Sequence, residues 1–249
     1  MIRFKWFFLR VRDCALRFLK NFFRTCLSIC MVVAVLLAGY VIYDANVVSI
    51  SAKLGDELKN LTPHDNEFDF GEWTRINSDI VAWLQIDGTS IDYPVLQAGD
   101  NDYYLSRNYR EEFATAGSIF LDYRDSINES DFSIVYGHRM GNGEMFTDVT
   151  KYSNKSFFDS HRLGKVYMER EVRSLMAVGF AKIRYDANEI YTTHNDVSVA
   201  LDYLRKNAVV WDEEMNATRG DGGHYMLLST CDATDKMLRD VLLINCVII

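Results

Sequence analysis

The feature that most constrains the fold of this chain is an uninterrupted apolar run near its start. Residues 25–43 contain no charged side chain, and a helix rising about 1.5 Å per residue over this run crosses most of a bilayer's hydrocarbon core. The preceding residues, 1–24, carry seven Lys and Arg against the single Asp13. Because short basic segments stay in the cytoplasm, we expect a single-pass anchor with everything after residue 43 outside the cell.

A cleaved signal peptide is the alternative interpretation of this run. The basic segment is long for a signal peptide, and no convincing small-x-small cleavage site follows the run. We therefore favour an uncleaved signal anchor. It divides the chain into a cytoplasmic basic segment, 1–24, a transmembrane segment, 25–43, a juxtamembrane helix or linker, 44–70, and a globular domain, 71–249.

The outer part of the chain is strongly acidic. The 249 residues carry a net charge of −8, and because residues 1–24 contribute +6 and the apolar run nothing, −14 remains on residues 44–249. Such a surface repels polyanions. We therefore expect no nucleic-acid partner.

Strand-like segments dominate the outer part. Helical spacing of apolar residues predicts helices only at residues 44–60, 77–84 and 196–207. Alternation or β-branched content indicates strands in "QIDGTSIDYPVLQ", "AGSIFLDYR", "FSIVYGH", "GKVYMEREVRSLMAVGFAKIRY", "HYMLLSTC" and "RDVLLINCVII". Many strands with inserted helices predict a mainly β fold, a closed or nearly closed antiparallel barrel.

Two cysteines fall in the outer part, and their surroundings differ. Cys246 lies in the apolar run "VLLINCVII", where a cysteine acts as a small buried hydrophobe. Cys231 lies in "LLSTCD", between small hydroxyl residues and an acid at the end of a strand-like run. A disulfide between the two is the alternative expected of an exported domain. We favour Cys231 as a candidate nucleophile.

A nucleophilic thiol needs a base or a cation beside it, because a pKa of about 8.5 leaves only about 3% thiolate at neutral pH. His138 is the candidate base, since the strand "SIVYGH" delivers it to a glycine-containing loop. Arg239 is the candidate cation. If residues 233–238 connect a hairpin, Arg239 lies beside Cys231 and can hydrogen-bond an oxyanion.

The order of strand, "YGH", a long gap, "LSTC" and an arginine on the next strand resembles the sortases, membrane-anchored cysteine transpeptidases of Gram-positive bacteria. The resemblance covers most of residues 70–249. It is specifically to the class B branch in "VAWLQIDGTSIDYPVLQAGDNDYYL", "AGSIFLDYR", "YGHRMGNGEMF" and the helix before the cysteine strand. It implies a sortase-type closed β-barrel of about eight strands, preceded by N-terminal helices, and neither a metal nor an organic cofactor.

The resemblance also implies roles for single residues. Cys231 matches the nucleophile that cleaves a sorting signal after its threonine and holds the substrate as a thioacyl intermediate. His138 matches the general acid and base for the leaving and incoming amines, and Arg239 matches the cation that steadies the substrate carbonyl or its oxyanion. Positions that resemble the walls of the sorting-peptide groove are Asn101, Leu105, Ser229 and Asp232.

Two features depart from the family pattern. Leu227 stands where the usual signature "TLxTC" begins with threonine, which predicts a change in groove polarity and substrate preference rather than in the reaction. The spacing of eight residues from Cys231 to Arg239 is short beside some relatives, yet it is compatible with a hairpin.

The partners implied are secreted proteins with a C-terminal sorting motif, and a peptidoglycan precursor or a pilin that supplies the accepting amine. Two alternatives remain open from the sequence. One is a secreted cysteine peptidase or amidase that hydrolyses its substrate with the same thiol and histidine. The other is a non-catalytic, membrane-tethered surface domain in which Cys231 pairs with Cys246.

Overall fold

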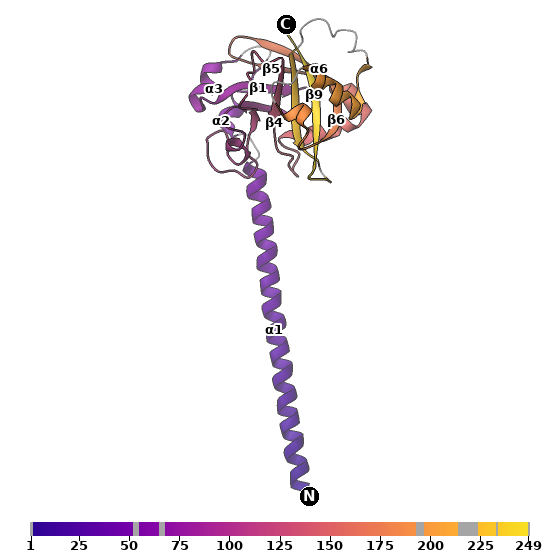
Figure 1. The fold of residues 1–249 in the computed structure, drawn as a ribbon. Helices are drawn as coiled ribbons and strands as arrows, with labels where there is room; N and C mark the ends of the chain where they lie inside the picture. Colours follow the sequence, from indigo (N-terminus) through magenta and orange to yellow (C-terminus); the bar gives the residue numbers. More distant parts are fainter. Residues whose placement is uncertain are drawn as a thin grey trace. The chain divides into compact units, whose positions relative to one another are not determined.

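The structure, a computed structural model, describes residues 2–51, 55–64, 68–192, 197–213, 224–232 and 234–248. It divides into two compact units, Met1–Val47 and Val48–Ile249 (Figure 1). Helix α1 (Ile2–Ser51) forms the first unit up to Val47, and its last residues belong to the second unit. Its segment Leu16–Tyr43 is, by length and composition, able to cross a membrane as an anchor or a signal sequence.

Eight strands of the second unit close into a barrel (Figure 1). In order around the ring they are β5 (Leu163–Tyr167), β1 (Ile80–Ile86), β2 (Asp92–Leu96), β3 (Ile119–Leu121), β4 (Phe132–Tyr136), β8 (His224–Cys231), β9 (Leu238–Ile248) and β6 (Val172–Arg184). Pairing of β5 with β6 closes the ring, and β7 (Ala208–Trp211) extends the sheet from β6. The predicted closed barrel is confirmed.

The barrel is mixed rather than antiparallel throughout. Strands β2 and β3 are parallel, as are β4 and β8, whereas the other pairs are antiparallel. Parallel neighbours require long crossovers, and residues 97–118 and 137–223 supply them. The expectation of an antiparallel barrel was wrong. The sequence pattern shows where strands occur, but the direction of each pair depends on which strands become neighbours in the barrel.

Two short helices, α2 (Asp56–Lys59) and α3 (Phe70–Ile76), precede β1. The other helical elements lie between strands: η1 (Tyr103–Leu105), η2 (Phe146–Ser153), α4 (Lys155–Ser160), α5 (Asn188–Tyr191) and α6 (Val197–Lys206). Helix α6 confirms the prediction for 196–207 in its described residues. The predicted helix over 44–60 corresponds to the end of α1 and to α2, and residues 52–54 between them lie outside the described residues.

The helix predicted at 77–84 is wrong. Helix α3 ends at Ile76, and β1 begins at Ile80. Most side chains of β1 are buried, including successive ones that point to opposite faces. Both faces of the strand are therefore covered. For this reason its apolar residues do not alternate cleanly with polar ones.

Strand β8 separates two layers of the core. Leu228 packs with the cluster that includes Val135 and Leu242, whereas Leu227 packs with Val241 and with Leu204 of α6. Leu227 is fully buried. The residue that departs from the family signature is therefore part of the packing beneath α6, and the pocket described below does not include it.

The two cysteines of the barrel lie at opposite ends of one strand pair. Cys231 is opposite Arg239, while Cys246 is opposite His224 at the other end of β8. A rise of about 3.3 Å per residue separates the two ends by more than 20 Å, beyond the reach of a disulfide. Both thiols are free, which rules out the alternative built on their pairing.

Candidate active site

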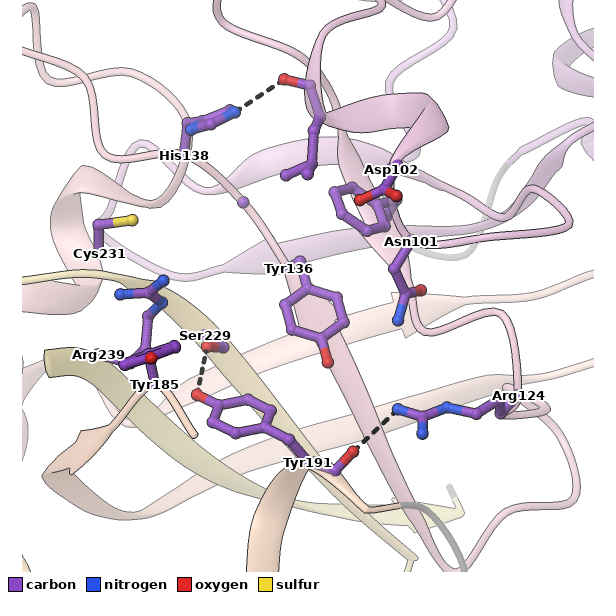
Figure 2. A pocket seen from close by; sticks show the side chains of 13 residues that line it. Asn101, Asp102, Arg124, Tyr136, His138, Tyr185, Tyr191, Ser229, Cys231 and Arg239 are labelled. Atoms are coloured by element: carbon purple, nitrogen blue, oxygen red, sulfur yellow. Dashed lines mark hydrogen bonds between the residues drawn. The ribbon is translucent and has the colours of Figure 1, made fainter. Parts of the chain in front are cut away.

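Cys231 is the last residue of β8, and its side chain is exposed. The antiparallel register places it directly opposite Arg239, the second residue of β9. Residues opposite one another in this way share a face of the sheet. Figure 2 shows the Cys231 sulfur and the Arg239 guanidinium on the same side of the pocket. The hairpin predicted from the sequence is confirmed.

The Arg239 guanidinium is held by backbone carbonyls. One nitrogen, Nη1, donates to the carbonyl oxygens of Lys236 at 3.0 Å and Leu238 at 2.9 Å. The guanidinium carbon also lies 5.8 Å from the centre of the Tyr185 ring. In the part of the chain that the structure describes, no carboxylate forms an ion pair with Arg239. Its remaining donors are therefore available to a ligand.

His138 follows β4 and lines the same pocket, on the side that also carries Cys231 and Arg239 (Figure 2). Its Nε2 atom lies 2.8 Å from the carbonyl oxygen of Leu105. Because a carbonyl only accepts, Nε2 carries the proton in this contact, and Nδ1 of the neutral ring is left as the acceptor. The backbone of Leu105 thereby fixes the tautomer and the orientation of the imidazole.

Gly117 leaves room for the Leu105 carbonyl, because it has no side chain. Its φ of +58° lies in the left-handed region that favours glycine, and a Cβ atom there would lie 2.7 Å from the Leu105 oxygen and 2.6 Å from the Tyr104 oxygen. A side chain at this position would displace the carbonyl that orients His138. The sequence contains Gly117 in "AGSIFLDYR", but nothing in its local pattern indicates this contact.

A pocket of about 390 Å³ brings these groups together (Figure 2). The residues predicted from the sequence that line it are Cys231, His138, Arg239, Asn101, Leu105 and Ser229. The lining residues that the sequence did not single out are Asp102, Phe120, Arg124, Tyr136, Gly137, Tyr185 and Tyr191.

Asp232 is the predicted groove residue that does not line the pocket. Strand alternation turns it away from Cys231, and its carboxylate pairs with Lys182 within the protein. Burial alone would raise the pKa of Asp232, but hydrogen bonds from Lys182 and Thr234 hold it well below its usual value. The structure thus gives this acid contacts inside the protein rather than in the groove.

A buried carboxylate organises the wall opposite Cys231. Asp122 is fully buried and accepts from Arg124 Nε at 2.9 Å and Nη2 at 2.8 Å, from Asn101 Nδ2 at 2.9 Å and from Tyr136 Oη at 3.0 Å. Burial opposes ionisation, yet these donors hold the pKa of Asp122 below its usual value. Arg124 and Asn101 therefore face the pocket from fixed positions.

Tyr191 of α5 links this wall to the cysteine strand. Its backbone carbonyl accepts from Arg124 Nη2 at 3.0 Å, and its hydroxyl lies 3.0 Å from Ser229 Oγ (Figure 2). Burial raises the pKa of Tyr191 to about 12, so it stays a neutral hydrogen-bonding group. No short-range sequence signal indicates Tyr191, because its partners come from distant segments.

A closed barrel that presents a cysteine, a histidine and an arginine to one pocket is the site of a thiol enzyme. The family model described as "Sortase domain" matches residues 84–246, which is more than half of the chain. The chain therefore belongs to the sortase family and is a cysteine transpeptidase.

Relatives place the chain in the class B branch. It is 44% identical over 201 residues to sortase B of Listeria monocytogenes, covering 78% of this chain and 74% of the relative. It is 30% identical over 222 residues to sortase B of Staphylococcus aureus, covering 84% and 90%. The solved structure of Clostridium perfringens sortase B matches with a TM-score of 0.66 at 25% identity, covering 72% of this chain and all of that one.

Proposed function

We propose that this pocket cleaves a C-terminal sorting signal after its threonine and transfers the new acyl group to an amine. The observation that carries the proposal is the meeting of Cys231, His138 and Arg239, from the ends of three strands, in one pocket. The structure of the Staphylococcus aureus sortase B–substrate complex, 29% identical with a TM-score of 0.61 over 71% of this chain and 83% of that one, supports a substrate site in this fold.

The first half-reaction forms a thioester on Cys231. The proton of the Cys231 thiol passes to His138, the thiolate attacks the carbonyl carbon of the scissile peptide bond, and the carbonyl oxygen becomes negative. The donors of Arg239 that its backbone contacts leave unused stabilise this oxyanion, because Arg239 lines the pocket opposite Cys231 before charge develops. His138 then protonates the leaving nitrogen, the carbon–nitrogen bond breaks, and the acyl group remains on sulfur.

The second half-reaction returns the thiol. An incoming amine attacks the thioester carbon, and His138 accepts the amine's proton. The carbon–sulfur bond breaks to release the new amide, and the proton passes from His138 to the Cys231 sulfur. The contact of Nε2 with the Leu105 carbonyl supports Nδ1 as the nitrogen that exchanges this proton. Asn101, Leu105 and Ser229, which line the pocket, are the proposed contacts to the sorting peptide.

We also propose that residues 25–43 anchor the chain, with residues 1–24 in the cytoplasm and the barrel outside. This topology brings the pocket to proteins as they emerge from the cell. A sortase B structure complexed with triglycine, 28% identical with a TM-score of 0.63, supports an acceptor with a free amino group. A Streptococcus pyogenes class B sortase of similar fold is involved in pilus biogenesis. The primary amine of a pilin lysine is therefore the second acceptor that we propose for this chain.

The test is a peptide-cleavage assay on the full-length chain in detergent. A pool of sorting-signal peptides is incubated with and without triglycine or diaminopimelate, and the products are sequenced by mass spectrometry. We expect cleavage after threonine, an amide product that requires the added amine, and neither product with Cys231→Ala. Acid products formed at the same rate with or without amine would indicate a hydrolase and would overturn the transfer step.

A further inference from the structure

A lysine bridges two buried carboxylates directly behind the catalytic strand pair. Lys182 of β6 contacts the carboxylate of Asp232 and lies 2.8 Å from that of Asp240 in β9. Both acidic side chains are only 2% exposed, whereas the Lys182 side chain is 39% exposed. The three residues therefore join β6, β9 and the end of β8 by charge as well as by backbone hydrogen bonds.

These groups lie on the face of the sheet opposite the pocket. Asp240 is paired with Thr230 across β8–β9 and with Lys182 across β6–β9. Side chains alternate between faces along a strand, so Asp240 points away from its neighbour Arg239, as Thr230 does from Cys231. The ion cluster thus touches the catalytic residues only through the backbone that both share.

The contacts favour the charged forms of Lys182 and Asp232, whereas those around Asp240 do not favour its charge. Burial opposes the charge of Lys182, yet hydrogen bonds to Asp232 and Asp240 raise its pKa above the usual value. Burial also raises the pKa of Asp240, and the neighbouring charge of Asp232 adds to this rise against the opposing effect of Lys182. Removing the ammonium would leave two like charges buried together, an arrangement that proteins avoid.

The carboxylate of Asp232 also sets the turn between β8 and β9. Its Oδ1 atom accepts from the backbone nitrogens of Thr234 at 2.7 Å and Asp235 at 2.9 Å, and from the Thr234 hydroxyl at 2.7 Å. The same turn presents the Lys236 carbonyl oxygen to Arg239 Nη1. A continuous series of contacts therefore runs from Lys182 through Asp232 and the turn to the guanidinium.

We propose that Lys182 and Asp232 are positioning residues for Arg239: their ion pair fixes the turn whose Lys236 carbonyl aims the guanidinium at the reacting carbonyl. This proposal rests on the proposed role of Arg239 as the stabiliser of the oxyanion. Neither Lys182 nor Asp232 lines the pocket. Their loss acts on the rate of the chemical step, because a displaced guanidinium stabilises the transition state less while the pocket walls that bind the peptide stay in place.

The experiment is a double-mutant cycle between Lys182→Met and Arg239→Ala, measured as single-turnover and steady-state cleavage of the preferred peptide by the full-length chain in detergent. We expect Lys182→Met to lower kcat about 10-fold with KM changed less than about 2-fold. In the Arg239→Ala background the same substitution should change the rate less than about 2-fold, because no guanidinium remains to be positioned. Lys182→Arg, which keeps a cation between the two acids, should restore most of the rate.

The matched control is Lys155→Met, which removes a lysine from an exposed ion pair with Asp159 and should leave kcat unchanged. Asp232→Asn and Asp232→Ala form a second pair that does not depend on the folding of Lys182→Met. Asp232→Asn keeps an oxygen acceptor for the turn, whereas Asp232→Ala does not, so Asp232→Ala should lower kcat more. This difference in kcat between the two variants should vanish when each is combined with Arg239→Ala.

The positioning role would be overturned if Lys182→Met lowered kcat equally in the wild type and in Arg239→Ala. A change in KM with no change in kcat would overturn it as well. Wild-type turnover by Lys182→Met together with impaired turnover by Arg239→Ala would also overturn it, while leaving the proposed function intact. Wild-type turnover by Arg239→Ala itself would instead refute the role of Arg239 in the proposed function, and the positioning role with it.

Discussion

Cys231 and Arg239 face each other across the β8–β9 strand pair, so their Cβ atoms are separated by only about 5 Å. This pairing ties the position of the sulfur to that of the guanidinium. A carbonyl carbon within reach of the sulfur therefore has its oxygen within reach of the arginine. The oxyanion stabilisation that we propose for Arg239 therefore rests on the register of these two strands.

Arg239→Ala should lower kcat about 100-fold or more with little change in KM, because the lost donor acts on charge that develops only in the transition state. Arg239→Lys should recover little of this rate, since an ammonium lacks the planar set of donors. Steady-state cleavage of a fluorogenic sorting peptide measures both. Full activity of the lysine variant would show that charge alone suffices.

Gly117→Ala should impair His138 although Gly117 itself does not line the pocket. The new Cβ meets the Leu105 carbonyl, which orients the imidazole, and misplacement of a catalytic group lowers kcat by about 10-fold or more. Gly143→Ala is the matched control, since Gly143 also has a positive φ, +87°, but nothing lies within 4 Å of its Cβ position.

Both glycine variants should unfold more readily by about 1 kcal/mol from the left-handed backbone alone. Only Gly117→Ala should combine this loss with slower turnover. Thermal unfolding and cleavage kinetics on the same samples test the distinction, and an equal loss of turnover in the two variants would contradict the link from Gly117 to His138.

The two barrel thiols should differ sharply in reactivity. Cys231 is exposed, whereas Cys246 is buried and burial raises its pKa to about 12. Because the thiolate is the reactive form, Cys246 should resist iodoacetamide from about pH 6 to about pH 9 until the protein unfolds. Peptide mapping after timed alkylation follows each cysteine separately. Rapid alkylation of Cys246 in the folded protein would contradict the buried position.

Asp122 should make the barrel sensitive to acid. Because its pKa is lowered in the folded state, its stabilising effect is complete above the unfolded value of about 3.9 and is lost as the pH falls through the lower folded value. Asp122→Asn should cost about 3 kcal/mol at neutral pH, since Arg124 loses its buried partner. This difference from the wild type should shrink below about pH 3.9.

Urea unfolding followed by tryptophan fluorescence at a series of pH values measures this difference. Asp186→Asn is the control, because Asp186 pairs with Arg184 on the exposed surface and exposed pairs stabilise proteins little. A constant difference between wild type and Asp122→Asn across the whole pH range would show that the titration of Asp122 does not govern acid stability.

Much of the site was predictable because it depends on short-range pairing. A hairpin connection over residues 233–238 brings Arg239 beside Cys231 by geometry alone, and the strand ending in "YGH" delivers His138 to its loop. Asp232 shows that a residue next to the cysteine in sequence need not line the same pocket. It follows Cys231, yet strand alternation turns its carboxylate to Lys182 on the opposite face.

The remaining features depend on contacts between distant segments. Tyr191 reaches Ser229, and Gly117 holds Leu105, only after the barrel has closed. Strand direction in the ring was equally hidden, because the parallel pairs follow from long crossovers. The misassigned helix at 77–84 has a similar cause, since a strand covered on both faces lacks the alternation that identifies strands.

The central claim is that Cys231 carries the acyl group, and intact mass spectrometry of the full-length chain in detergent tests it most directly. With a cleavable sorting peptide, we predict a mass increase equal to the peptide's acyl portion, mapped to Cys231, absent from Cys231→Ala, and discharged when triglycine is added. An adduct on another residue, or cleavage by Cys231→Ala at the wild-type rate, would contradict the account.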